Sequence, residues 1–322
     1  MQPARPRPNV KTLIKVAVSV SLLLALVLMT DVYAVGRAML SVGPLLWVGS
    51  LGLYLAGHVI SAQKWRRLAA PELSRFHSLR AHFSGLAANL ALPGAASGDI
   101  VRAGVAMQSG RERALIAVGS LADRIIDTFG LLILAFAGWL LATPVADHVA
   151  WPAVLAGICV MGVVLFLLAK PCTQGALRFF ERRSGKVSGL IAKMLRSVLV
   201  LLGSPFQLLT CLAISLFVQG LFIGISAMIG MAAGINVSLF VWVFAWPLSK
   251  LVATLPISMG GIGIREASLA GLMVPFGADP ALVVASGLVW QSIVIVGALV
   301  GMAMISFTSA GIGKPGEQNG DM

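Results

Sequence analysis

The sequence has 322 residues, of which 58% are hydrophobic and only 11% are charged, and its mean hydropathy is +0.94. A soluble domain carries about 25% charged residues, so this composition excludes a soluble single domain. The 24 Lys and Arg residues outnumber the 12 Asp and Glu residues, which gives a net charge of +12. These basic residues lie between apolar runs rather than along one face, which argues against a nucleic-acid-binding protein.

Six apolar segments are long enough to cross a bilayer as helices, which takes about 20 mostly apolar residues. They are residues 13–30, 39–60, 114–142, 149–169, 206–232 and 281–308. Basic residues precede the first segment, but no small-residue cleavage site follows it, so we interpret it as a retained helix rather than a signal peptide. The sequence therefore predicts an all-α polytopic membrane protein with six full spans.

Two further apolar segments, residues 81–109 and 238–276, are each interrupted in the middle by proline and glycine. The interruptions are Pro93 with Gly94 in the first segment and Pro256 with Gly260 in the second. Proline removes a backbone donor, and glycine permits the positive φ angles of a tight reversal. Broken backbone at membrane depth is tolerated only where it is buried or lines a cavity, so we expect two re-entrant helical hairpins.

The distribution of positive charge predicts the orientation of the chain. If each hairpin returns to the side that it left, six crossings place both termini on the same side. Nineteen of the 24 Lys and Arg residues then fall in one set of segments, and the opposite set keeps only Arg37. The positive-inside rule makes the first side cytosolic. We expect a single transmembrane domain over residues 1–322, a short cytosolic tail at 309–322, and an interfacial helix at 63–80 on the anionic cytosolic leaflet.

The two hairpins carry the same motif. Residues 92–102 and 255–265 both read Leu-Pro, four residues, Gly, three residues, Arg. Each hairpin is preceded by two spans and followed by one, so three crossings per half leave the second copy inverted. The sequence predicts an inverted-topology repeat, with halves at 13–142 and 149–308, as in secondary transporters whose substrate sites lie near the midplane.

This geometry predicts two opposed anion sites, one in each half. The return helices begin near Gly98 and Gly261, where unpaired backbone N–H groups and the positive dipole end favour phosphate or carboxylate. Arg102 and Arg265 fall about one turn into these helices, where each adds a charge-assisted and bidentate contact to a phosphate.

Eight charged residues fall at membrane depth, where ionisable side chains are expensive and usually mark functional pathways. They are Arg102, Arg124, Lys250 and Arg265 with Asp99, Asp123, Asp127 and Glu266. We expect Arg124, Asp99, Asp127 and Glu266 to join the two arginines at a lipid or anion site. The alternative is local pairing of Arg124 with Asp127, Asp99 with Arg102, and Arg265 with Glu266. For Lys250 the alternative is snorkelling toward an interface.

No motif predicts a metal site or a cofactor. The histidines, His58, His77, His82 and His148, lack metal-ligand spacing, and we interpret them as interfacial. The three cysteines form no CxxC motif, and no nucleotide-binding loop is present. A GxxxG motif at Gly297 and Gly301 permits close helix packing within the chain or in a homo-oligomer.

Together, three stretches suggest a family: Leu92-Pro93 to Arg102, Asp123-Arg124 with Asp127, and residues 260–266, which read Gly-Gly-Ile-Gly-Ile-Arg-Glu. Over nearly the whole chain the sequence resembles the membrane region of lysylphosphatidylglycerol synthases, a flippase-like family. The resemblance implies a lipid-handling module of a bacterial inner membrane, with enzymes of lipid biosynthesis as partners. Bifunctional synthases carry a soluble aminoacyl-transfer domain after this region, and we expect a stand-alone member without it.

These observations predict a non-enzymatic, flippase-like protein that translocates or handles an anionic phospholipid or a lipid-linked intermediate. The alternative is an intramembrane enzyme, or an accessory subunit, in lipid, glycolipid or hopanoid biosynthesis. In that alternative Asp99, Asp127 or Glu266 acts as the acid or base.

Overall fold

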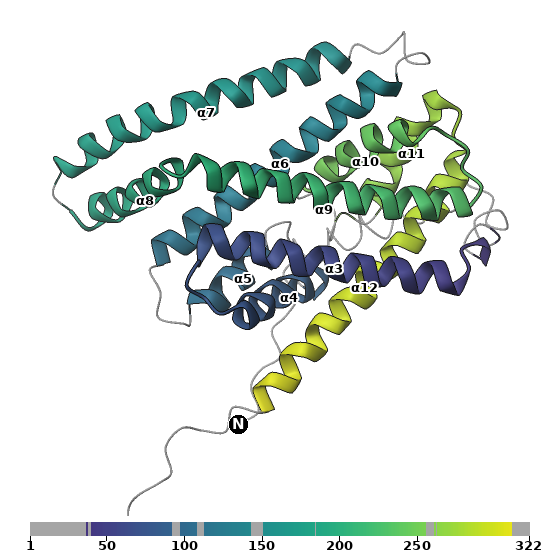
Figure 1. Ribbon diagram of the computed structural model, residues 1–322, viewed down its shortest axis with the longest axis horizontal. Helices are drawn as coiled ribbons and strands as arrows, with labels where there is room; N and C mark the ends of the chain where they lie inside the picture. The colour runs from purple at the N-terminus through teal and green to yellow at the C-terminus, as the bar shows by residue number, and fades with distance from the viewer. Residues whose placement is uncertain are drawn as a thin grey trace, which may run out of the picture.

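The computed structural model describes residues 37, 40–91, 97–107, 113–142, 151–183, 185–255, 261 and 263–310 of the chain. Within these ranges all regular elements are helices (Figure 1). The predicted span at 13–30 and the predicted hairpin breaks at Pro93, Gly94, Pro256 and Gly260 lie outside the described residues. Most of the predicted tail, residues 311–322, also lies outside them.

Four described helices are long and apolar enough to cross a membrane. They are α3 (Pro44–Ala69), α6 (Arg113–Ala142), α9 (Pro205–Ala232) and α12 (Pro280–Ala310), the last counted over Pro280–Val300. They match the predicted spans at 39–60, 114–142, 206–232 and 281–308. The chain is therefore an all-helical membrane protein.

Helix α3 is longer than predicted, which corrects the expected interfacial helix at 63–80. No proline or glycine interrupts the chain between Gly57 and Pro71, so the helix continues to Ala69 and buries Lys64 and Trp65. A separate helix, α4 (Arg75–Ala91), begins after a short turn. The predicted interfacial segment is thus divided between two helices, and its first basic residue lies inside the protein.

A second difference concerns the segment expected to end at residue 169. Helix α7 (Trp151–Glu181) continues through Pro171, although proline removes one helical hydrogen bond. Helix α8 (Lys186–Leu202) then returns along α7, and the two helices lie side by side at one end of the bundle (Figure 1). An ion pair of 2.8 Å between Arg196 and Glu181 joins them.

The two segments predicted as hairpins each form a pair of consecutive helices that pack together. The first pair is α4 with α5 (Ser97–Met107), and the second is α10 (Leu239–Ala253) with α11 (Ile264–Met273), which a short 3-10 helix, η2 (Val274–Phe276), follows. In the first pair the backbones touch, because a Cβ atom at Gly98 would lie 2.4 Å from the carbonyl oxygen of Gly85. Before α11, Gly261 adopts a positive φ of 76° beside Ala253. Only glycine fits such positions without strain.

The helix contacts follow a simple exchange rule. Helices α3, α4, α5 and α6 correspond in order to α9, α10, α11 and α12, and each contact of one set has an equivalent in the other. The contact of α4 with α12 corresponds to that of α10 with α6, and the contact of α3 with α6 corresponds to that of α9 with α12. The contact of α6 with α9 likewise corresponds to that of α12 with α3, and α3 and α9 contact each other. The two sets of four helices are therefore equivalent in their contacts, as is expected of two structural repeats.

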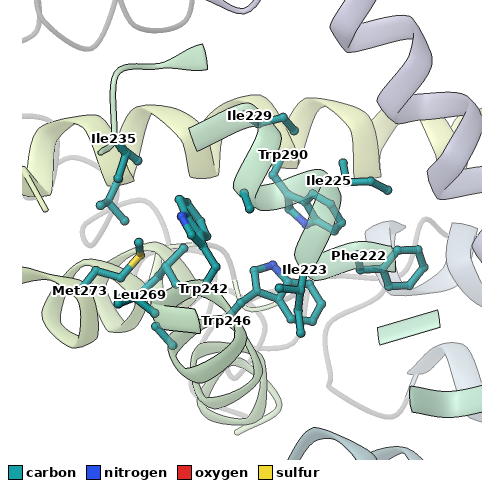
Figure 2. Close-up of a cluster of buried hydrophobic side chains, with 14 of the residues drawn as sticks. Phe222, Ile223, Ile225, Ile229, Ile235, Trp242, Trp246, Leu269, Met273 and Trp290 are labelled. Carbon is teal, nitrogen blue, oxygen red and sulfur yellow. The ribbon is translucent and has the colours of Figure 1, made fainter. Parts of the chain in front are cut away.

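The main hydrophobic core lies where α9, α10, α11 and α12 meet (Figure 2). Trp246 and Trp290 contact each other edge to face, with ring centroids 5.8 Å apart. Gly297, from the predicted GxxxG motif, packs against Tyr54 of α3, and a Cβ atom there would lie 2.6 Å from the tyrosine ring. The motif therefore serves packing within the chain at this position.

Candidate functional site

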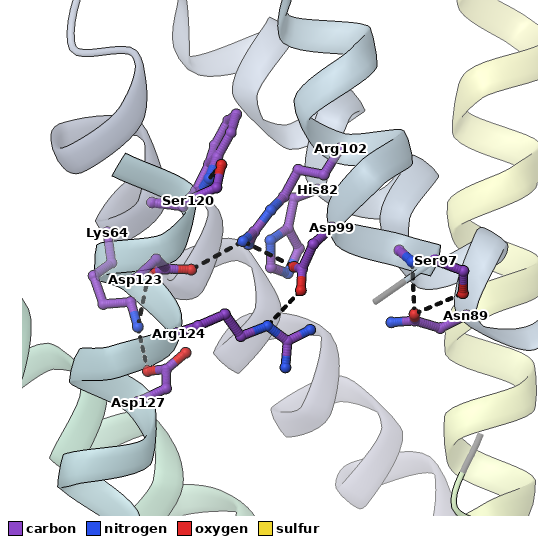
Figure 3. A network of polar contacts seen from close by, with 12 residues as sticks. Lys64, His82, Asn89, Ser97, Asp99, Arg102, Ser120, Asp123, Arg124 and Asp127 are labelled. Atoms are coloured by element: carbon purple, nitrogen blue, oxygen red, sulfur yellow. Dashed lines mark hydrogen bonds and ion pairs between the residues drawn. The ribbon is translucent and has the colours of Figure 1, made fainter. Parts of the chain in front are cut away.

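The first group of charged side chains joins helices α3, α5 and α6 (Figure 3). Lys64 of α3 forms ion pairs with two carboxylates of α6, Asp127 and, at 3.0 Å, Asp123. The two acids are four residues apart and so project from the same face of α6. Only 2% of the Lys64 side chain and 4% of the Asp123 side chain are exposed. The hydroxyl of Ser215, from α9, donates a hydrogen bond of 2.6 Å to Asp127.

Two arginines extend this group toward α5. Arg102 lies 3.1 Å from both Asp99 and Asp123 and stacks over the ring of Trp65, 4.9 Å from its centroid. Arg124 of α6 pairs with Asp99 at 2.5 Å, and 45% of its side chain is exposed. The predicted local pair of Arg124 with Asp127 is therefore wrong, because neighbouring helices supply closer partners for both residues. The predicted pair of Asp99 with Arg102 is present.

A second group lies at the start of α11. Arg265 pairs with Glu266, as the local-pairing alternative predicted, and also donates a hydrogen bond of 3.2 Å to Gln291 of α12. Glu266 is 1% exposed and accepts a hydrogen bond of 2.8 Å from the backbone N–H of Gly263. Gly287 makes room for Glu266, since a Cβ atom there would lie 2.7 Å from the glutamate Cγ.

The helix N-termini differ from the prediction of unpaired amides. The N–H of Gly98 donates to the side-chain oxygen of Asn89 at 2.8 Å, and the N–H of Gly263 donates to Glu266. Gly261 contributes its carbonyl oxygen, which accepts from the N–H of Arg265 at 3.0 Å. The N–H groups of Gly98 and Gly263 therefore already have acceptors within the protein and are not free to bind an anion in this structure.

Lys250 of α10 lies near members of both groups. Its ammonium donates a hydrogen bond of 2.8 Å to Gln219 and lies 5.0 Å and 5.6 Å from the ring centroids of Trp246 and Phe222. It is close enough to interact electrostatically with Asp127 of the first group and Arg265 of the second. Among the ion pairs of the described residues none includes Lys250. The snorkelling alternative is therefore wrong, since the ammonium is held within the bundle.

We refer to these nine side chains as the charge centre. Its cations are Lys64, Arg102, Arg124, Lys250 and Arg265, and its acids are Asp99, Asp123, Asp127 and Glu266. Five cations against four acids leave one positive charge in excess. The excess is assigned to Lys250, the cation of the centre that contacts no carboxylate in the described part of the chain. Arg124 and Asp127 form the most accessible part, with 45% and 31% of their side chains exposed.

Several members of this site are not evident from the sequence. Lys64 lies in the segment predicted to be an interfacial helix, and Gln219, Gln291 and Ser215 carry no charge that would mark them in an apolar span. The sequence does contain a signal for Lys64, because no proline or glycine interrupts the chain between Gly57 and Pro71 and the helix can continue past Lys64. The prediction of interfacial histidines is wrong for two of them, since His58 Nδ1 and His82 Nε2 lie 3.1 Å apart inside the bundle.

The described residues contain no group of three or more His, Cys, Asp or Glu side chains arranged to hold a metal ion. What the arrangement offers chemically is electrostatic. The nine side chains come from five helices and are mostly compensated, with one excess cation, and α9 and α12 add uncharged hydrogen-bond partners.

The fold and the charge centre define a class, that of polytopic helical membrane proteins with ionisable side chains inside the bundle. The chain belongs to the family described as the lysylphosphatidylglycerol synthase TM region, whose family model matches residues 12–301. The match covers nearly the whole chain and confirms the family suggested by its motifs. It identifies the protein as a membrane protein of a family involved in lipid handling. No similar sequence was found among curated proteins.

Proposed function

We propose that the protein is a flippase-like membrane protein that binds the anionic headgroup of a phospholipid or lipid-linked intermediate and moves it between leaflets. The observation that carries the proposal is the excess positive charge of the charge centre, placed on Lys250. An uncompensated charge inside a membrane protein is costly, and such residues usually pair with something. A headgroup with one negative charge would neutralise the centre.

The accessible cations are the ones that we assign to the headgroup. Arg124 is 45% exposed and Arg265 is 15% exposed, and each has one carboxylate partner. Arg102 is 7% exposed and holds two carboxylates, so we assign it to positioning those acids rather than to direct contact with phosphate. This assignment places the headgroup near Lys250, between the two helix pairs.

The exchange rule in the helix contacts supports an inverted repeat as the device for movement between leaflets. In our proposal the two helix pairs are re-entrant hairpins that enter from opposite sides, within six full spans, and the site lies between them. Transporters of this kind alternate access by moving one repeat against the other around a fixed site. The excess of Lys and Arg on one side supports cytosolic termini in a bacterial inner membrane.

The enzymatic alternative finds less support in the geometry. Its acid or base would be Asp99, Asp127 or Glu266, and each of these carboxylates pairs with at least one cation. These carboxylates are engaged by cations of the protein and are therefore not free partners for a substrate. We therefore propose that lipid is moved without covalent change.

A translocation assay tests the proposal. The protein is reconstituted into vesicles with fluorescent phosphatidylglycerol, and a membrane-impermeant quencher reports the fraction in the outer leaflet over time. We expect facilitated movement that Lys250→Met slows by about tenfold to a hundredfold, because loss of the excess charge should weaken headgroup binding by about as much as loss of a charged hydrogen bond, about 1.5–3 kcal/mol. Lys193→Met is the matched control, since Lys193 is exposed on α8. Equal rates for Lys250→Met and the unmodified protein would contradict the proposal, and a chemically altered lipid would favour the enzyme.

A further inference from the structure

Two histidines meet beside the charge centre without belonging to it. His58 of α3 and His82 of α4 approach through their ring nitrogens at 3.1 Å, and His82 is 7% exposed. The remaining nitrogens, His58 Nε2 and His82 Nδ1, are buried and have no hydrogen-bond partner among the described residues. The pair is therefore an isolated imidazole–imidazole contact with one unpaired nitrogen on each ring.

The charged groups around the pair come from four helices. They are Lys64 of α3, Arg102 of α5, Asp127 and Arg124 of α6, and Lys250 of α10, all close enough for electrostatic interaction with one ring or the other. Helices α9 and α12 also pack against this region, and their described residues carry no charge; α9 contributes the ring of Phe222 and α3 that of Tyr54. No hydrogen bond or ion pair in the described part of the chain joins either imidazole to a carboxylate.

By its geometry the His58–His82 pair can bind one extra proton but not two. In the neutral pair one imidazole donates its N–H to the bare nitrogen of the other, which leaves one outer nitrogen with a proton and one without. A proton added to the bare outer nitrogen keeps the central hydrogen bond and makes it charge-assisted. A second proton would place two N–H groups against each other across 3.1 Å.

The charge balance links this proton to the headgroup. Burial away from water and the excess positive charge of the empty charge centre both oppose a further proton on the histidines. A phosphodiester headgroup adds one negative charge and removes the part of this opposition that comes from the charge centre. Because binding linkage is reciprocal, a headgroup that favours the proton is itself favoured by the proton.

We propose that the His58–His82 pair is a proton-binding site coupled to headgroup binding at the charge centre, so that an anionic lipid is carried together with one proton. The inference rests on the proposed function and adds to it a pH gradient as the source of energy for transport. Lipid and proton together carry no net charge, so the translocation step is electroneutral and responds to a pH gradient rather than to the membrane potential. Acid on the side of loading favours uptake of the lipid.

Proton uptake on lipid binding tests this inference directly. The purified full chain is placed in weakly buffered detergent at pH 6.5–7, near the ordinary titration range of histidine. Phosphatidylglycerol is added to saturation, lipid binding is followed by displacement of a fluorescent analogue, and a pH-indicator dye reports protons in the same sample. A phosphodiester keeps one negative charge throughout this range, so the lipid itself takes up none.

We expect the unmodified protein to take up a proton as it binds phosphatidylglycerol, approaching one per lipid. His58→Gln and His82→Gln should bind the lipid with little or no proton uptake. His77→Gln is the matched control, because His77 is exposed and bonded to Ser74, away from the pair, and it should behave as the unmodified protein does.

Binding of lipid without proton uptake by the unmodified protein would overturn the coupling and leave the proposed function standing. Proton uptake that persists in both histidine variants would also overturn it, by placing the proton elsewhere. Absence of phosphatidylglycerol binding by the unmodified protein would overturn this inference and the proposed function together. The first of these outcomes needs no variant, so the test does not depend on how well the variants fold.

Discussion

Removing the ammonium of Lys64 should destabilise the fold more than any other single change of a lysine in the described chain. Lys64→Met keeps most of the side-chain length but leaves Asp123 and Asp127 without their shared cation. Removing one partner of a buried ion pair lowers the free energy of unfolding by about 3–5 kcal/mol. Asp123 still has Arg102 at 3.1 Å, and Asp127 still has the hydroxyl of Ser215 at 2.6 Å. We therefore expect the lower end, about 3 kcal/mol, which is a hundredfold change in the unfolding equilibrium.

Denaturant unfolding in mixed micelles, followed by circular dichroism, measures this effect. Lys193→Met on the exposed face of α8 is the matched control and should change the free energy of unfolding by no more than about 0.5 kcal/mol. The double variant Lys64→Met with Asp127→Asn restores charge balance in the first group and should recover most of the loss. The reasoning is refuted if Lys64→Met behaves like the control, or if the double variant is less stable than the single one.

Three further predictions concern packing and orientation. Gly98→Ala should destabilise the protein by about 1–3 kcal/mol, because its Cβ would lie 2.4 Å from the backbone of α4. Gly104→Ala in the same helix meets open space and should leave the stability unchanged. Thermal unfolding compares the two variants. Gly287→Ala should displace Glu266 and weaken binding of fluorescent phosphatidylglycerol. Unchanged affinity in a folded variant would argue against a role of the Arg265–Glu266 pair in lipid binding. In a cysteine-free background, Arg182→Cys on the predicted cytosolic side should react with an impermeant maleimide only after cells are permeabilised. Asp279→Cys on the opposite side should react in intact cells. The opposite pattern would show that the predicted orientation is inverted.

The helices were predictable where hydropathy alone decides them. The boundaries of α6, α9 and α12 fall within one or two residues of the predicted spans, since each apolar run is long and ends at polar or proline-containing sequence. Prediction failed at Pro171, where a proline that normally ends a helix is accommodated within α7. It failed again at Lys64, because a charge near the end of an apolar run looks the same whether it faces water or a partner on another helix.

The members of the charge centre were largely predictable, but their partners were not. Intramembrane charge alone identified Asp99, Arg102, Arg124, Arg265 and Glu266 as candidates. Sequence spacing shows only neighbours on the same helix, so it suggested a pair of Arg124 with Asp127. The observed partners come from α3 and α5, and such contacts depend on helix packing that small residues permit.

The lipid that remains bound to the purified protein tests the central claim most directly. Lipids are extracted from the protein isolated in mild detergent, and mass spectrometry compares their composition with that of the source membrane. The account predicts that lipids with one negative charge are enriched on the unmodified protein, and that Lys250→Met loses this enrichment while remaining folded. A lipid composition equal to that of the membrane in both proteins, or equal enrichment in both, would contradict the claim that the excess charge on Lys250 selects an anionic headgroup.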